Sequence, residues 1–141
     1  MLDFSLKATD EALFARLSSL DFQVICGVHE PEEAAVARRF FPPEQILAFM
    51  PSPDMAAAFS AAGAGILRLW EYWVEVEDIP GFKAKMPAPC EVWIMSCDQS
   101  IRHPLFSMNS SEAQLRRLCA LGADGVLCND IRMALAVQKK G

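Results

Sequence analysis

The stretch AQLRRLCALGADGVLCND, from Ala113 to Asp130, decides the expected fold of this chain. Its first half carries leucines at helical spacing and predicts an amphipathic helix, and its second half contains a short apolar strand, Val126 to Cys128. Gly122 stands where a helix C-cap favours a left-handed residue, and Gly125 is expected to allow a tight turn into the strand. A strand without polar alternation is usually covered on both faces. The stretch therefore predicts the closing half of a βα repeat in a parallel sheet.

The rest of the chain continues this alternation of strand and helix. Further strands are expected at Leu2 to Lys7, Phe22 to Val28, Gln45 to Met50, Ile66 to Val74 and Glu91 to Cys97. Helices are expected from Thr9 or Asp10 to Leu20, Pro31 to Phe41, Asp54 to Ala62, around Phe82, after Ser110 or Ser111, and from Ile131 to Lys140. The side chains expected to face inward from the first helix are Leu13, Phe14, Leu17 and Leu20; from the fifth, Leu115, Leu118, Cys119 and Leu121; and from the last, Ile131, Leu135 and Ala136. Short connections join most elements, so residues 1–141 are expected to form a single α/β domain with a parallel sheet.

Composition limits the classes of protein that this chain can belong to. Its 141 residues suit one domain, and 52% hydrophobic with 22% charged residues argue against disorder. The net charge of −5 offers no basic patch, which argues against a nucleic-acid partner. No apolar run is long enough to span a membrane, and the N-terminus lacks the pattern of a signal peptide, so a cytoplasmic location is expected. The five cysteines form no CxxC motif or Cys/His cluster and are expected to be mostly buried, reduced thiols.

Four stretches, taken in order, resemble one enzyme family. LGADGVLCND (121–130) is similar to a last strand reading LGVDGIITD, and EVWIMSCD (91–98) to a preceding strand reading V-x-VWTVN. FSLK (4–7) is similar to IEIK, and VICGVHEPE (24–32) lies where the pattern has VIISSFDPE. These patterns belong to the glycerophosphodiester phosphodiesterases, which have a TIM-barrel fold. The resemblance covers nearly the whole chain and implies a partial TIM (β/α) barrel, the last five to six strands with their helices.

The same resemblance implies that this chain lacks the family's catalytic groups. The family's two catalytic histidines come from an HRG-type motif and a nearby His, and two metal-binding carboxylates come from an ENT-type motif, none of which has a counterpart here. Ser5 stands where IEIK has its third metal ligand, and a hydroxyl is a poor ligand for a hard cation. We therefore expect no catalytic residue, metal or cofactor in this chain, although intact relatives use Mg²⁺ or Ca²⁺. The expected ligand is a glycerophosphodiester or a glycerol 3-phosphate-like molecule, and the alternative is a non-catalytic module that binds a phosphorylated metabolite or another subunit.

Three residues are candidates for substrate binding. The resemblance places Lys7 on the family's lysine and Trp93 on its tryptophan. Lys7 could hold a phosphate or be a solvated lysine at a helix entry, and Trp93 could pack on a substrate or belong to the barrel core. Glu71 interrupts an apolar run and could pair with Arg68 or point into the mouth of the barrel.

Other polar residues near strand ends are weaker candidates for a functional role. His29 could act as a general base or be a loop histidine without a role. Asp98 and Asp130 are expected to be loop and capping residues, and His103 lies in an expected long loop, Asp98 to Asn109. Five or six strands of an eight-stranded barrel would leave two open edges and an uncovered inner face. Because open edges tend to pair, the chain is expected to form a homo-oligomer such as a dimer, to open into a flatter α/β sheet, or to be only marginally stable.

Overall fold

Helices and strands alternate throughout the computed structural model, which describes residues 2–3, 11–21, 23–70, 78–96, 110–128 and 130–138. The strands are β1 (Leu2–Asp3), β2 (Cys26–Val28), β3 (Ile46–Phe49), β4 (Ile66–Trp70), β5 (Glu91–Met95) and β6 (Gly125–Leu127). The α-helices are α1 (Glu11–Ser18), α2 (Pro31–Ala37), α3 (Ala56–Ala62), α4 (Ile79–Ala84), α5 (Glu112–Ala120) and α6 (Ile131–Gln138), and the 3-10 turns are η1 (Pro43–Gln45) and η2 (Pro53–Met55). All lie within or beside the ranges expected from the sequence. The expected loop Asp98 to Asn109 lies outside the described residues.

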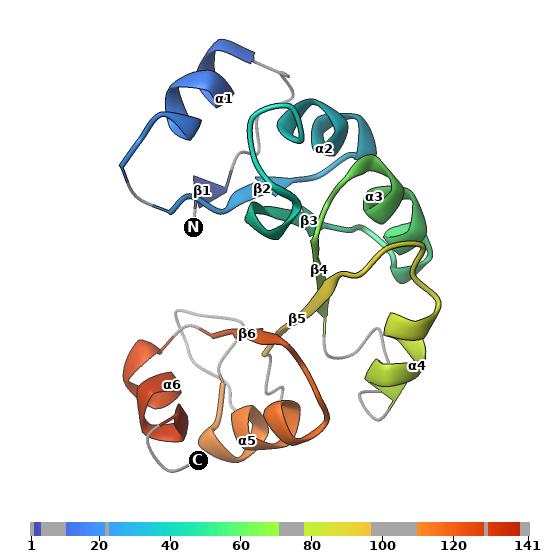
Figure 1. The fold of residues 1–141 in the computed structure, drawn as a ribbon. Helices are drawn as coiled ribbons and strands as arrows, with labels where there is room; N and C mark the ends of the chain where they lie inside the picture. The colour runs from blue at the N-terminus through green and yellow to red at the C-terminus, as the bar shows by residue number, and fades with distance from the viewer. Residues whose placement is uncertain are drawn as a thin grey trace.

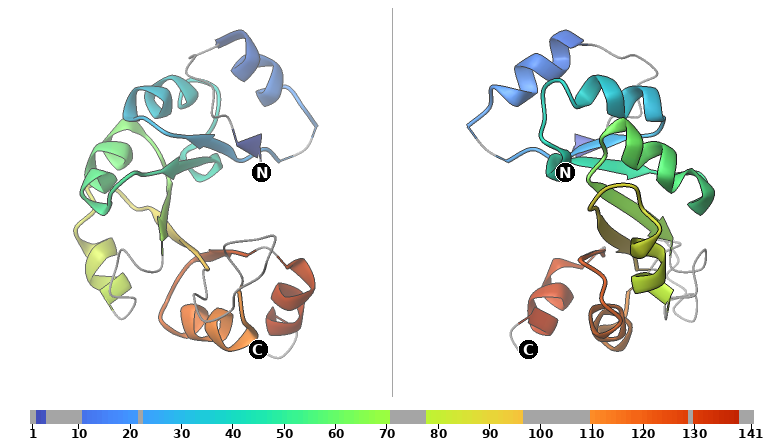
Figure 2. Two further views of the ribbon diagram at one scale, coloured as in Figure 1. Left: turned by 180° about the vertical axis from the view of Figure 1, so that it is seen from behind. Right: turned by 45° about the vertical axis from the view of Figure 1, so that its right-hand side comes forward.

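The six strands form one sheet in the order β1-β2-β3-β4-β5-β6, and every neighbouring pair is parallel. Each strand is therefore hydrogen-bonded to the next strand in the chain, without the reversal of order found in doubly wound sheets. The ribbon curves into an open arc with the helices on its convex side (Figure 1), and the views in Figure 2 show the same arrangement. This is a partial (β/α) barrel with a parallel sheet, as the sequence predicts.

Local signals explain where the helices begin and end. The Ser111 hydroxyl caps α5 by accepting a hydrogen bond from the backbone N–H of Gln114 at 3.2 Å. Gly63 and Gly122 follow α3 and α5 in left-handed conformations, with φ of 106° and 89°. The expected C-cap at Gly122 is therefore confirmed. Gly125 has another role, because its φ is not positive and an added Cβ would lie 2.7 Å from the indole of Trp93.

The main core lies between the sheet and the helices on its convex side. Alternate strand residues point into it, namely Cys26, Val28, Ile46, Ala48, Leu67, Leu69, Val92 and Ile94, all at most 1% exposed. They meet small or aromatic residues of the helices, including Ala34 and Ala37 of α2 and Phe59 of α3. Burial of a leucine or isoleucine side chain contributes about 1.5–3 kcal/mol, so this layer is the main source of stability.

The opposite, concave face of the sheet is better covered than an open half-barrel predicts. Leu47 and Ile66 are at most 1% exposed there, although they face away from the helices. Part of the cover comes from aromatic rings that lie across glycines on neighbouring strands. The Phe49 ring occupies the space where Gly27 would carry a Cβ, and Trp93 does the same over Gly125. The expectation of an uncovered inner face is therefore wrong at β3 and β4.

Three helix faces also differ from the sequence expectation. Leu20 lies beyond the end of α1 and is exposed, while Phe14 is the buried residue of that helix. In α5, Leu115 and Leu118 are buried but Cys119 is exposed. In α6, Ile131 and Leu135 point outward with 74% and 46% exposure. Ala136, which was also expected to face inward, is partly buried, as are Met133, Ala134 and Val137. Ala134 and Val137 line a small cavity with Leu115 and Val126.

The position of β6 at the end of the sheet explains a further difference. Its three residues are all only partly buried, whereas the apolar sequence predicts a strand covered on both faces. In the described part of the chain β6 pairs with β5 alone, so one side of the strand has no neighbouring strand to cover it. None of the helices in the described ranges combines the length and the apolar character that crossing a bilayer requires.

Candidate functional site at the mouth of the partial barrel

The strands β2, β3 and β4 bring a small group of aromatic and charged residues together at their C-terminal ends. In parallel (β/α) barrels this end of the sheet is where ligand sites form. A cavity of about 360 Å³ lies here, which we call the mouth cavity, and it is lined by His29, Glu30, Phe49, Met50, Pro51, Arg68 and Trp70. Its residues come from the ends of successive strands and the turns that follow them.

Four of these side chains stack in one row across the strands. The His29 ring lies parallel to the Phe49 ring, with the centroids 5.0 Å apart and the planes inclined by 12°. The Arg68 guanidinium lies over Phe49 at 4.9 Å and over Trp70 at 4.4 Å from the ring centroids. Register explains the row, because Arg68 pairs with Phe49 across β3 and β4. The mouth cavity therefore has a cationic group held between aromatic faces.

Arg68 is the most unusual residue of this group. Its side chain belongs to a residue that is 6% exposed, and a buried charge is costly unless other groups stabilise it. Cation–π contacts with two rings provide part of this stabilisation, about 0.5–2 kcal/mol each depending on how far they are desolvated. The guanidinium is therefore fixed in place at the cavity wall.

The N-terminus of α2 positions His29. The Glu33 carboxylate accepts hydrogen bonds from the backbone N–H groups of His29 at 2.8 Å and Glu30 at 3.3 Å. Pro31 occupies the first turn of α2, where its missing N–H costs nothing. The loop that carries His29 is thus tied to the helix that follows it, and the imidazole is held against Phe49.

The structure places the predicted site residues in different situations. Lys7 and Glu71, like Ser5, Asp98 and His103, lie outside the described residues. Trp93 stands next to Arg68 in register on the concave face, but its indole lies over Gly125 and its Nε1 donates to the Glu91 carboxylate at 2.7 Å. It is not among the residues that line the mouth cavity.

Asp130 caps the beginning of α6, as expected. Its carboxylate accepts a hydrogen bond from the backbone N–H of Arg132 at 2.9 Å. Hydrogen bonds from the Arg132 side chain lower the pKa of the Asp130 carboxyl below its ordinary value, and those from the backbone add to this effect.

Sequence reasoning treated Arg68 only as a partner for Glu71 and did not foresee its place in the mouth. The available signal is a lone cation at the centre of the apolar strand ILRLW, two residues before a tryptophan. Within a strand these two residues share a face. The contribution of Phe49 from another strand could not be read in this way.

Cysteines and acidic residues do not form a metal centre in the described ranges. No group of three or more His, Cys, Asp or Glu side chains there could hold one ion. The four described cysteines, Cys26, Cys90, Cys119 and Cys128, are all free thiols, but only Cys26 is buried, which corrects the expectation of mostly buried thiols.

Fold and site together define a class: a partial (β/α) barrel whose mouth presents an arginine between aromatic rings. Comparisons with known protein families, with curated proteins and with solved structures found no match.

Proposed function

We propose that this chain is a glycerophosphodiester phosphodiesterase-like domain that binds a phosphorylated small molecule at its mouth without hydrolysing it. Glycerol 3-phosphate and glycerophosphodiesters are the ligands that the sequence resemblance favours. The observation that carries the proposal is Arg68, a cation with 6% exposure that lines a cavity at the C-terminal ends of the strands. A cation kept at such a position is suited to an anionic ligand.

Stacking of Arg68 is compatible with phosphate binding. The rings of Phe49 and Trp70 contact the flat faces of the guanidinium, whereas a phosphate is bound at its edge through N–H groups in a planar fork. Holding the plane in advance reduces the entropy that a flexible side chain loses on binding. His29, on the other face of Phe49 in the row, adds a ring with an N–H group of the kind that donates to phosphate oxygens.

The composition of the mouth favours binding over hydrolysis. The family's reaction uses two histidines and a metal held by several carboxylates. Among the described residues that line the mouth cavity there is one histidine, His29, and one carboxylate, Glu30. We therefore assign no hydrolytic step to these residues. The proposal also includes the residues expected from the sequence. Lys7 would bind the same phosphate, and Trp93 and Glu71 would contact the substrate.

Calorimetric titration with glycerol 3-phosphate tests the binding. Arg68→Met should weaken binding about 10- to 100-fold, because a charge-assisted hydrogen bond contributes about 1.5–3 kcal/mol. Arg68→Lys keeps the charge but loses the fork, so an intermediate loss is expected. Lys7→Ala should also weaken binding.

Arg39 provides the matched control, because it is an exposed arginine that lies over a ring, Phe40, at 5.7 Å on the outer side of the molecule. Arg39→Met should leave the affinity unchanged. No heat with the unmodified chain, or an equal loss from Arg39→Met, would contradict the proposal. Release of glycerol 3-phosphate from glycerophosphocholine in the presence of Mg²⁺ or Ca²⁺ would refute its non-catalytic part.

A further inference from the structure

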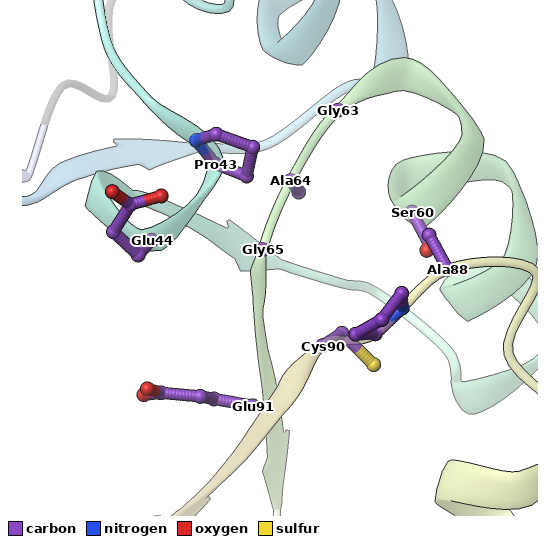
Figure 3. A pocket seen from close by; sticks show the side chains of 10 residues that line it. Pro43, Glu44, Ser60, Gly63, Ala64, Gly65, Ala88, Cys90 and Glu91 are labelled. Atoms are coloured by element: carbon purple, nitrogen blue, oxygen red, sulfur yellow. The ribbon is translucent and has the colours of Figure 1, made fainter.

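A second and larger cavity, of about 530 Å³, lies at the opposite ends of the strands from the mouth. We call it the lower cavity, and it adjoins the N-terminal ends of β4 and β5 (Figure 3). It is lined by Pro43, Glu44, Ser60, Gly63, Ala64, Gly65, Ala88, Pro89, Cys90 and Glu91. Its volume is within the range of small-molecule sites, and most of its lining is apolar.

Backbone contacts keep the wall of the lower cavity in place. The Gly65 N–H donates to the Pro43 carbonyl at 2.9 Å, and the Glu91 N–H donates to the Gly65 carbonyl at 2.7 Å. Gly65 approaches Pro43 so closely that an added Cβ would lie 2.5 Å from its backbone. The part of the wall at Gly65 is thus main chain fixed by hydrogen bonds.

One polar group in this cavity is unexplained by the fold. Ser60 is 6% exposed, and its Oγ has no hydrogen-bond partner. In a helix, a serine hydroxyl commonly bonds to a carbonyl one turn earlier, and a buried hydroxyl without any partner costs about 1–3 kcal/mol. Figure 3 shows this oxygen directed from α3 toward the chain at Ala88. A ligand with a hydrogen-bonding group would satisfy it.

The charges around the lower cavity restrict the ligand further. Among the described residues, the ionisable groups that line it are the carboxylates of Glu44 and Glu91 and the thiol of Cys90. Both carboxylates point to the other side of β4 from Ser60 in Figure 3. Burial raises the pKa of the Cys90 thiol, which favours its neutral form. The described lining residues therefore offer no positively charged group to an anionic ligand, in contrast to Arg68 at the mouth cavity.

We propose that the lower cavity binds a small uncharged or cationic molecule that has an apolar body and a hydroxyl or amino group bonded to Ser60. The hydroxyl of serine can both donate and accept, so either ligand group satisfies it. No positively charged side chain is present among the described lining residues to repel a cationic ligand. This site is separate from the mouth and does not depend on the function proposed there.

Protection of Cys90 from N-ethylmaleimide gives a site-resolved test. The probes are 4-phenylbutanol, 4-phenylbutylamine and 4-phenylbutyrate, which share one apolar body and differ in their polar group. Labelling of each cysteine is followed by peptide mass spectrometry. The alcohol and the amine should slow labelling at Cys90, and the carboxylate should do so only at concentrations about tenfold higher or more, a difference of about 1.4 kcal/mol. Cys119, which is exposed on α5 and lines the separate small cavity beside α6, reports protection elsewhere in the chain.

Two variants make the result specific. Ser60→Ala should fold normally, because its Oγ makes no hydrogen bond, and should weaken protection by the alcohol about tenfold. Ala88→Trp places a large ring at an exposed wall residue and should abolish protection by the alcohol and the amine. The proposal is overturned if no probe protects Cys90, if the carboxylate protects as well as the amine, if Ser60→Ala has no effect, or if Cys119 is protected equally.

Discussion

Replacing Gly65 by alanine tests the contact on which the packing of η1 against β4 depends. The added Cβ would lie 2.5 Å from both the C and O atoms of Pro43 and 2.9 Å from the backbone nitrogen of Glu44. All three atoms are main chain, so no side-chain rotation can relieve the overlap. The strand must move away from η1, and the hydrogen bond from Gly65 N to the Pro43 carbonyl must lengthen or break.

The expected loss of stability follows from three terms. Overpacking costs about 1–3 kcal/mol, and the lost hydrogen bond adds about 0.5–1.5 kcal/mol. Alanine restricts the unfolded chain and offsets about 0.4–1 kcal/mol of this. The net loss is about 2 kcal/mol, a substantial part of the roughly 5–15 kcal/mol that stabilises a typical domain.

Urea unfolding followed by tryptophan fluorescence and by far-UV circular dichroism measures this loss. Gly122→Ala is the matched control, since no atom lies within 4 Å of its added Cβ and the only cost is the left-handed φ of 89°. That cost is about 1 kcal/mol. If Gly65→Ala unfolds at the same urea concentration as the unmodified chain, the packing of η1 against β4 described here is wrong.

Two further measurements concern the core and the edge of the sheet. Burial, with a smaller contribution from Glu33, raises the pKa of the Cys26 thiol to about 11. The unfolded chain therefore loses this proton at a lower pH than the folded chain. The free energy of unfolding should fall by about 2–3 kcal/mol as the pH rises from 9 to about 11. Urea unfolding across this range should show a shallower decline in Cys26→Ala, and equal slopes would refute the assignment. Ile131 and Leu135 are exposed one turn apart on α6, beside the edge strand β6, so light scattering at increasing concentration should show self-association. Replacing both by glutamate should shift the chain to a monomer, whereas an unmodified chain that is monomeric at every concentration would contradict this expectation.

Local patterns in the sequence were sufficient for the order and type of the elements. Helix boundaries at Pro31, Ser111 and Gly122 follow from backbone preferences of single residues, and the structure confirms them. The alternation of strand and helix requires parallel neighbours, because each helix returns the chain to the start of the next strand. A parallel sheet could therefore be predicted without knowledge of any long-range contact, whereas the partial barrel was expected only from the family resemblance.

The orientation of individual residues was less predictable at the margins of the fold. The apolar period of α6 fits more than one helix face, and packing against Leu115 and Val126 places Ala134 and Val137 inward in place of Ile131. Glycine is common in turns, and Gly125 was therefore expected to form one. In the structure, its missing side chain instead leaves room for the indole of Trp93 on the neighbouring strand. Such choices depend on the neighbour and not on the residue itself.

The sequence by itself determined the alternation of elements, the parallel sheet and the helix caps, because these depend on residues within a few positions of one another. Tertiary structure alone decided the two cavities. The row of His29, Phe49 and Arg68 exists because the register of β2, β3 and β4 brings distant residues to the same end of the sheet. Ser60 likewise lines a cavity only because the chain at Ala88 lies opposite it. Contacts between strands and helices far apart in sequence are set by packing of the whole core, which no local pattern encodes.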